Sequence, residues 1–402
     1  MPRADSQRQM ERVKQARFDR NPLPTALGRG LSPSLILSLV LLGSCIHPPS
    51  KTIAKAAPNT LHVFAYALGA GDIALLSFDP STGHLSLEKS FSQSGNYGAI
   101  SSDGRHMYVC DGKGEHGVIH AFSRDTHDGT LKWLASTNSG GSAPTHLSVD
   151  PAGHFVLVAN FRSDDVHVFQ MQPDGRLGAS VASLPTGHRP HQIAFSHDGR
   201  FVFVPNRDDD SVGRYRFDKR SGSLQELPAA DGNQTRLRTH PRPRHIAIHP
   251  SNRAAYLVHE GEMTLVSYDL DPDTGNLTNP AAATTRQGGG AHVIVSPDGR
   301  FVYVSVRSPP ASIYTYEVDP ASFRPRQLQR FVHPSITGPR DFAIDATGTF
   351  LLVGSQEQHT VVTLQLNTAN GTVSNVKQAV RINSNAAFVG FARETHGMQR
   401  QD

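Results

Sequence analysis

The stretch SHDGRFVFV, residues 196–204, decides the fold because variants of it recur along the chain. The related phrases are SSDGRHMYV from residue 101, DPAGHFVLV from 150, HPSNRAAYLV from 249, SPDGRFVYV from 296 and DATGTFLLV from 345. Each phrase joins a turn to a short apolar run, and the Asp-Gly and Pro-Asp-Gly steps are typical of tight turns. Such repetition indicates a fold built from copies of one unit.

A second phrase lies between the copies of the first. Its members are FDPSTGHL from residue 78, RDTHDGTL from 124, QPDGRL from 172, FDKRSGSL from 217, LDPDTGNL from 270, VDPASFRPRQL from 318 and LNTANGTV from 366. Four short apolar runs fit into each unit, and in the third unit they are THLSVD, FVLVAN, DVHVFQM and LGASVAS. A four-stranded unit of about 40–50 residues predicts one blade of a β-propeller.

The two ends of the repeated region predict the number of blades. The first unit begins directly with a second strand, LHVFAYAL from residue 61, and the last unit is followed by an unpaired run, NAAFVGFAR from residue 385. This run can supply the missing inner strand of the first blade, and such closure protects the sheet edges. The predicted fold class is therefore all-β: a seven-bladed propeller of four antiparallel strands per blade, closed by the C-terminal strand.

Composition and charge exclude several classes of protein. The chain has 402 residues, of which 37% are hydrophobic and 18% charged, so it can bury a large core. Residues 1–58 hold nine Lys/Arg and three Asp/Glu, whereas the remainder holds 30 and 32. The basic character thus belongs to the N-terminal segment, and no nucleic-acid partner is expected for the folded part.

The N-terminal segment predicts export. Residues 35–46 read LILSLVLLGSCI, which is too short to span a bilayer but suits the apolar region of a secretory signal. The ending LGSC resembles a bacterial lipobox, which makes Cys45 the candidate lipidation site; an ordinary signal peptide and an uncut membrane anchor are the alternatives. We expect a signal segment at 1–45, a linker at 46–58, the propeller at 59–393 and a tail at 394–402. The protein would then be periplasmic or in the cell envelope, touching the membrane only through the lipid.

Candidate functional residues gather on one face of the predicted ring. The loop before the first strand of a blade and the loop after its second strand lie on the same face, because these strands are antiparallel. Before first strands stand His146, His191, Arg244, His245, His292, Arg340 and Asp341, and after second strands stand Asp111, Asn160, Arg207, Glu260, Arg307 and Gln356. Such a cleft can bind an anion and move a proton. Arg244 either binds substrate or pairs with Glu260.

Other motifs carry no cofactor or metal prediction. Residues 112–117 match G-x-G-x-x-G but precede a strand rather than a helix, so they indicate a hairpin loop. Residues 208–210 are three Asp in a hairpin turn, and the glycines at 288–290 lack the Lys of a P-loop. The 21 His are dispersed, and Cys110 lies in an apolar run as a small buried side chain. We therefore expect no cofactor and no metal.

Five blade phrases together resemble the lactonase family of seven-bladed propellers, which includes bacterial 6-phosphogluconolactonases and fungal carboxy-muconate lactonizing enzymes. The phrases are APTHLSVDPAGHFVLVANF, GHRPHQIAFSHDGRFVFVPN, RPRHIAIHPSNRAAYLVHE, AHVIVSPDGRFVYVS and GPRDFAIDATGTFLLV, and the resemblance spans about residues 60–393. The chain departs from the family at 259–261, His-Glu-Gly in place of Asn-Glu-Leu, and at 288–292, GGGAH without the acidic residue often found there.

The resemblance implies a catalytic His–Arg–Glu–Arg group. His191, Arg244 and Glu260 match by motif, and the second Arg is Arg307 or Arg340. His146, Arg207, His245 and His292 are further candidates for substrate binding.

Two classes of function follow from these features. The first is a lactone hydrolase, in which water attacks the ring carbonyl, His191 or Glu260 takes its proton, and Arg244 with a second Arg stabilises the oxyanion or holds an anionic tail. A muconate-type lactonizing enzyme would use the same groups. The second class is a non-catalytic binding propeller at the cell surface. For the enzyme, the expected partner is a small-molecule lactone and the expected state is a monomer.

Overall fold

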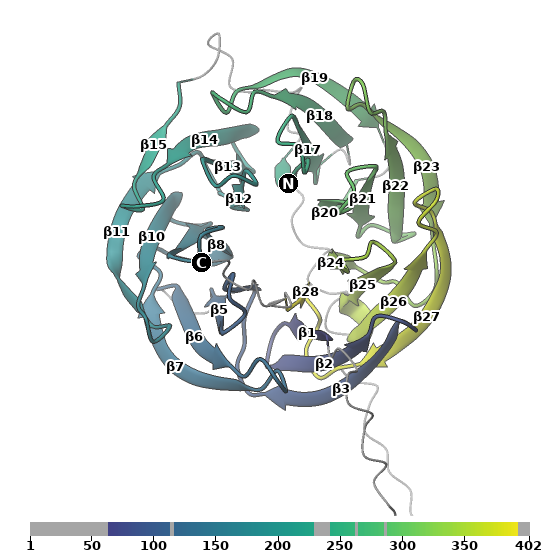
Figure 1. Ribbon diagram of the computed structural model, residues 1–402, viewed down its shortest axis with the longest axis horizontal. Helices are drawn as coiled ribbons and strands as arrows, with labels where there is room; N and C mark the ends of the chain where they lie inside the picture. The colour runs from purple at the N-terminus through teal and green to yellow at the C-terminus, as the bar shows by residue number, and fades with distance from the viewer. Residues whose placement is uncertain (1–62, 113–115, 229–241, 262–263, 285–287, 393–402) are drawn as a thin grey trace, which may run out of the picture. The chain divides into compact units, whose positions relative to one another are not determined.

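The computed structural model describes residues 63–112, 116–228, 242–261, 264–284 and 288–392, and these form the predicted propeller (Figure 1). Seven four-stranded antiparallel sheets stand around a central axis, each with its first strand innermost. The seven-bladed fold class is thereby confirmed. The predicted signal segment, Cys45, the linker and the tail lie outside the described residues.

The strands of each blade run in order from the axis outwards. Blade one is β28 Phe388–Phe391, β1 Val63–Leu68, β2 Ile73–Asp79 and β3 His84–Phe91, and blade two is β4 Tyr97–Ile100, β5 His106–Asp111, β6 Val118–Arg124 and β7 Leu131–Asn138. Blade three is β8 Pro144–Val149, β9 Phe155–Asn160, β10 Asp165–Met171 and β11 Leu177–Pro185, and blade four is β12 Ala194–Phe195, β13 Phe201–Asn206, β14 Ser211–Phe217 and β15 Leu224–Glu226. Blade five is β16 Pro243–Ile248, β17 Ala254–His259, β18 Thr264–Leu270 and β19 Leu277–Thr284. Blade six is β20 Gly290–Val295, β21 Phe301–Val306, β22 Ser312–Val318 and β23 Pro325–Phe331, and blade seven is β24 Pro339–Ile344, β25 Phe350–Ser355, β26 Thr360–Leu366 and β27 Val373–Arg381.

Ring closure occurs as the sequence predicts. β28 pairs antiparallel with β1, from Ala65 opposite Phe391 to Leu68 opposite Phe388. Val389 of β28 is buried in the cluster shared by blades one and seven. The last strand of the chain therefore joins the first blade to the last through both backbone pairing and apolar packing.

Packing between neighbouring blades explains the glycine of the second repeated phrase. Gly222 has φ of +74°, and a Cβ there would lie 2.6 Å from the ring of Phe155 in the preceding blade. Gly275 is placed in the same way against Phe201. The turn thus needs both a left-handed backbone and the absence of a side chain, which only glycine supplies without strain.

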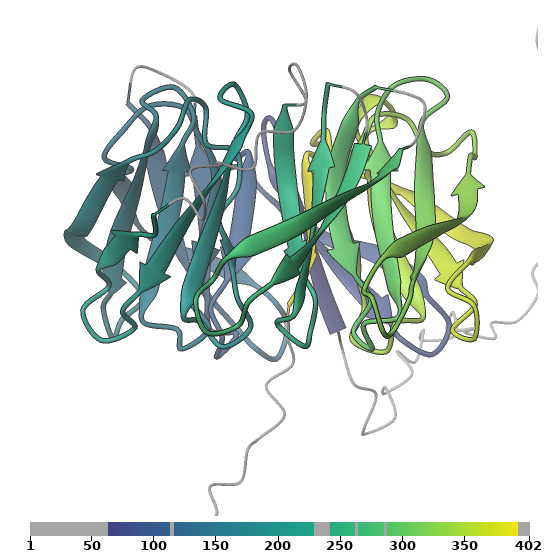
Figure 2. The ribbon, with the colours of Figure 1, turned by 90° about the horizontal axis from the view of Figure 1, so that it is seen from above.

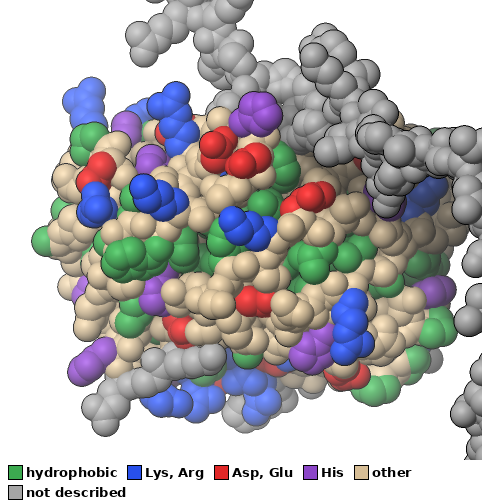
Figure 3. Space-filling model, turned by 90° about the horizontal axis from the view of Figure 1, so that it is seen from below, with side chains coloured by type: hydrophobic (Ala, Val, Ile, Leu, Met, Phe, Trp, Pro, Cys, Tyr) green, Lys and Arg blue, Asp and Glu red, His purple; other side chains and the backbone are tan. Residues whose placement is uncertain are grey.

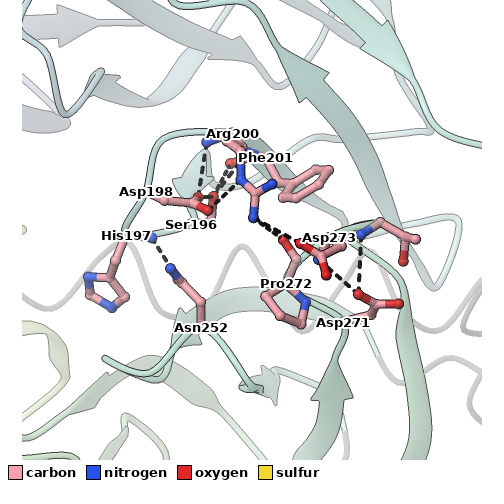
Figure 4. Close-up of polar contacts among 10 residues, drawn as sticks. Ser196, His197, Asp198, Arg200, Phe201, Asn252, Asp271, Pro272 and Asp273 are labelled. Atoms are coloured by element: carbon pink, nitrogen blue, oxygen red, sulfur yellow. Dashed lines mark hydrogen bonds and ion pairs between the residues drawn. The ribbon is translucent and has the colours of Figure 1, made fainter.

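The turns of the first repeated phrase lie on the face opposite the candidate functional residues. There they form hydrogen bonds to the neighbouring blade, as the close-up of the blade-four turn shows (Figure 4). The Asp198 carboxylate accepts hydrogen bonds from the Ser196 hydroxyl at 2.6 Å and the Arg200 backbone N–H at 3.1 Å. The Arg200 guanidinium also donates to the Pro272 carbonyl of the next blade at 2.5 Å. These polar turn residues are occupied by structural contacts, which leaves the other face for chemistry.

The second strands of the blades are buried, whereas the side wall of the propeller is exposed. Every residue of the second strands β9, β13, β17, β21 and β25 is buried. Strand ends alternate between the two faces, which Figure 2 shows edge-on. The side wall in Figure 3 mixes basic, acidic and hydrophobic side chains, and the exposed Trp133 belongs to outer strand β7. No helix in the described ranges is long and apolar enough to cross a membrane.

Candidate active site

One backbone hydrogen bond, repeated in three consecutive blades, positions the charged residues of the site. The residue that follows each second strand donates its N–H to the carbonyl of a residue just before or at the start of the first strand. The three bonds are Arg207 to Arg189 at 3.0 Å, Glu260 to Arg242 at 2.9 Å and Arg307 to Gly289 at 2.9 Å. Arg207, Glu260 and Arg307 therefore occupy equivalent positions in blades four, five and six. Their side chains are brought together at one mouth of the channel, as strand direction predicts.

Glu260 is held between the two arginines of the neighbouring blades. Arg207 Nε donates to Glu260 Oε2 at 2.6 Å, and the Arg307 guanidinium donates to Glu260 Oε1. Burial by itself would raise the pKa of Glu260, but the Arg207 hydrogen bond and the charges of Arg244 and Arg307 outweigh it and hold the pKa below its usual value. Glu260 is consequently an ionised carboxylate with both oxygens engaged.

The considered pairing of Arg244 with Glu260 is not the one that forms, because Glu260 takes its partners from the two adjacent blades. Arg244 is 2% exposed and donates to the Ala291 carbonyl. Burial lowers the pKa of Arg244, and the charges of Arg340 and Arg307 lower it further. Arg340 makes no hydrogen bond or ion pair with the described residues, and burial together with Arg307 lowers its pKa as well. Two guanidinium groups of the site therefore form no ion pair with a carboxylate in the described part of the chain.

His191 is a buried, neutral imidazole. Its backbone N–H donates to the Pro205 carbonyl at 2.9 Å, which anchors the residue ahead of β12. Its ring meets Phe161 edge-on at 5.8 Å between centroids and lies 5.4 Å from the ring of His245. Burial, and then the charge of Arg244, lowers the pKa of His191. Its Nδ1 is buried and has no hydrogen-bond partner among the described residues.

A second set of side chains stands one position after Arg244 and Arg340 in their blades, or at the equivalent position of other blades. Tyr97, His146, His245, His292 and Asp341 each stand four residues before the first residue of the repeated turn phrase. The His146 ring stacks on Tyr97 at 3.9 Å, with its Nε2 buried and unpartnered. The His245 and His292 rings share an Nδ1–Nδ1 hydrogen bond. No cluster of three or more His, Cys, Asp or Glu within the described ranges has metal-site geometry.

Tyr97 belongs to the candidate site and was missed by the sequence argument. Its position relative to the turn that follows is the signal that identifies it, because it matches that of His146 and His245. Three residues predicted to lie at the mouth of the channel have local structural roles. Asp111 accepts a hydrogen bond from Ser94, Asn160 donates to Ser139 and Asp165, and Gln356 begins the short 3-10 helix η2, Gln356–Gln358.

A cavity of about 540 Å³ adjoins the site on the blade three and four side. It is lined by Phe161, Arg162, Asp164, His188, Arg189 and Asp208. Phe161 meets the His191 ring, and Asp208 accepts a hydrogen bond from Arg207 at 3.0 Å, so two lining residues of the cavity contact residues of the candidate site.

The sequence is similar to that of lactonases with a seven-bladed propeller. Residues 60–389 match the family model described as "Lactonase, 7-bladed beta-propeller". The 6-phosphogluconolactonase of Bacillus subtilis is 28% identical over 345 residues, which cover 80% of this chain and 95% of the relative. That of Formosa agariphila is 26% identical over 357 residues, covering 83% and 96%.

Solved structures share the fold. A periplasmic gluconolactonase of Pseudomonas aeruginosa superposes with a TM-score of 0.73 at 24% identity, covering 83% of this chain and 99% of that one. A protein of Lactobacillus plantarum gives 0.73 at 22% identity with the same coverage.

Proposed function

The chain belongs to the lactonase family of seven-bladed β-propellers, and on this premise we propose that it hydrolyses a sugar lactone bearing an anionic group. The curated relatives named 6-phosphogluconolactonase support lactone hydrolysis. The observation that carries the proposal is the charge balance of the site. Arg207 and Arg307 are paired with carboxylates, whereas Arg244 and Arg340 form no ion pair with the described residues, and a neutral His191 lies beside them.

In the proposed reaction, a water molecule attacks the lactone carbonyl carbon while the His191 imidazole accepts its proton. A neutral imidazole can act in this way near pH 7, and the low pKa of His191 keeps the ring unprotonated. The carbonyl oxygen becomes an oxyanion, which Arg244 stabilises by charge and hydrogen bonding. The ring C–O bond then breaks, the alkoxide takes a proton, and the open sugar acid leaves.

Glu260 serves better as an anchor than as the base. Both carboxylate oxygens already accept hydrogen bonds from Arg207 and Arg307. We assign Glu260 to fixing these two guanidinium groups, which define one wall of the substrate site.

The anionic group of the substrate would be bound by Arg340. This guanidinium is without a partner among the described residues and lies near the positive charge of Arg307. Binding of a phosphate or carboxylate relieves that repulsion, and a guanidinium fork matches either anion.

We further propose that residues 1–45 direct export and that Cys45 is lipidated, which places a monomeric enzyme in the cell envelope. At that location the accessible substrates are extracytoplasmic lactones. A carboxylate is therefore as suitable an anionic group as the phosphate in the relatives' names.

The test is a lactone panel with the full-length protein: 6-phosphogluconolactone, unphosphorylated gluconolactone and an aldaric acid lactone. We expect hydrolysis above the uncatalysed rate, fastest with an anionic lactone. Arg340→Gln should raise KM for anionic lactones about tenfold or more and change that of the neutral lactone little. Arg326→Gln, at a side chain 70% exposed, is the matched control.

Other results would redirect the proposal. Lactone binding by calorimetry without turnover would favour the binding propeller. Formation of a lactone from a muconate, with no hydrolysis of the sugar lactones, would favour the lactonizing enzyme.

A further inference from the structure

Three buried titratable side chains from consecutive blades lie in a row at the site, and the steps above use none of them. His245 and His292 share a hydrogen bond between their Nδ1 atoms. Nε2 of His292 lies 3.7 Å from Oδ1 of Asp341, which is 2% exposed. At the other end of the row, the His245 ring lies 5.4 Å from that of His191, the proposed base. The row therefore leads from a buried carboxyl group to the reacting centre.

We propose that Asp341, His292 and His245 form a proton relay that protonates the alkoxide leaving group of the lactone. This inference rests on the proposed lactone hydrolysis. His245 is the catalytic acid that touches the substrate, and His292 and Asp341 are positioning residues that act through it. The relay supplies the proton that the opened ring oxygen requires.

The hydrogen bond between the imidazoles couples their tautomers. Of two neutral rings joined through Nδ1, one must carry the Nδ1 proton and the other must accept it. If His292 carries the proton at Nδ1, His245 must hold its own proton at Nε2. Nε2 of His245 makes no hydrogen bond with the described residues, so its proton is available to a substrate. His292 then accepts at Nε2 from a protonated Asp341, once their 3.7 Å separation shortens to about 3 Å.

The surroundings favour neutral groups throughout the row. Burial raises the pKa of Asp341 to about 8, although Arg244, the Phe342 backbone N–H and Arg340 oppose the rise. Burial and the charge of Arg244 lower the pKa of His292 to about 3. Tyr97 also faces Asp341, and burial raises the pKa of its phenol so that it stays neutral. At neutral pH the row thus holds one carboxylic acid and two neutral imidazoles.

The transfer moves protons without charging a ring. His245 gives its Nε2 proton to the alkoxide as the C–O bond breaks, and its Nδ1 takes the Nδ1 proton of His292. Nε2 of His292 then takes the Asp341 proton, which leaves a carboxylate. The proton that water left on His191 returns to Asp341 or escapes to solvent. Net hydrolysis yields the hydroxy acid carboxylate and one proton, so atoms and charges balance.

The first test varies the leaving group. Asp341→Asn keeps the shape and a hydrogen-bond donor but has no proton to release. With a sugar lactone, whose leaving group is an aliphatic alkoxide, kcat should fall about 100-fold or more. With 3,4-dihydrocoumarin, which releases a phenol of pKa about 10, the fall should stay below about fivefold, because a phenolate leaves without protonation.

A matched control separates the relay from general effects of losing a buried carboxylate. Asp345 belongs to the same blade at its opposite end and accepts backbone hydrogen bonds from Thr349 and Phe350. Asp345→Asn should lower the melting temperature, whereas turnover per folded molecule should match the wild type for both lactones. Equal losses on both lactones in Asp341→Asn would overturn the relay.

The second test needs no turnover. Long-range proton–nitrogen NMR of the full-length protein labelled with ¹⁵N-histidine distinguishes Nδ1-H from Nε2-H tautomers. In the wild type, His245 and His292 should exchange tautomers together with a midpoint near pH 8, and in Asp341→Asn neither should change. Unchanged tautomers in the wild type from pH 6 to 10 would refute the relay. If no lactone is hydrolysed, the proposed function fails, and this measurement still decides whether the tautomers are coupled.

Discussion

Replacing Glu260 with Gln keeps the size of the side chain and removes the charge that holds Arg207 and Arg307. The Gln oxygen can accept from one guanidinium, but the amide NH2 must then face the other, donor against donor. Arg207 keeps its ion pair with Asp208 at 3.0 Å. Arg307 has no other ion pair in the described part of the chain, so it bears most of the loss.

The expected loss of stability is about 2–3 kcal/mol. A hydrogen bond to a charged group contributes about 1.5–3 kcal/mol, and Glu260 accepts two of them. The Arg307 side chain is 31% exposed, so water recovers part of its loss. A domain of roughly 330 residues has an unfolding entropy of about 0.7 kcal/mol/K. The melting temperature should therefore fall by about 3–4 °C.

Thermal unfolding and lactone kinetics measured on the same preparations test this reasoning. Glu317→Gln is the matched control, because Glu317 pairs with Arg326 on the exposed wall and should lose less than about 1 kcal/mol. If Glu260 anchors the arginines, KM should rise while kcat falls less than about tenfold. A fall in kcat of about 10²–10⁴ with unchanged melting would instead make Glu260 the base. If Glu260→Gln and Glu317→Gln have the same melting temperature, Glu260 does not anchor Arg207 and Arg307.

Further expectations concern the fold, the pH response and the leader. Gly222→Ala should destabilise the protein by about 2–4 kcal/mol in denaturant titration, because its Cβ would meet Phe155 at a positive φ; a change below 1 kcal/mol would contradict the packing argument. Deleting 385–402 should abolish cooperative melting, since blade one loses its inner strand; a cooperative transition would disprove closure. Stability should decline as pH falls from 6.5 towards about 3, because the unfolded state binds a proton at His292 that the folded state excludes; His292→Gln should show a shallower decline in melting temperature. Cys45→Ser should release the protein from membranes in fractionation, and persistent membrane association would argue against lipidation.

The sequence was sufficient for the fold because blade formation depends on local features. The turn phrases demand specific backbone conformations, as Gly222 illustrates, and the intervening runs are rich in Val, Phe and other residues that favour strands. The unpaired run from residue 385 had one blade left to complete, and β28 completes it. Strand direction also predicted that the candidate residues share one face, since this depends only on the order of antiparallel strands.

The partners of each side chain could not be predicted in the same way. Arg244 and Glu260 are 16 residues apart in one blade, yet Glu260 pairs with arginines of the blades on either side, because equivalent loop ends face one another around the ring. The pKa values of Asp341 and His292 depend on burial and on charges from other blades, and neither is visible in the chain order. Sequence therefore determined the fold and the set of groups at the mouth, through short-range turn and strand preferences. Tertiary structure alone decided which groups are paired, charged or available, because those properties arise from contacts between blades.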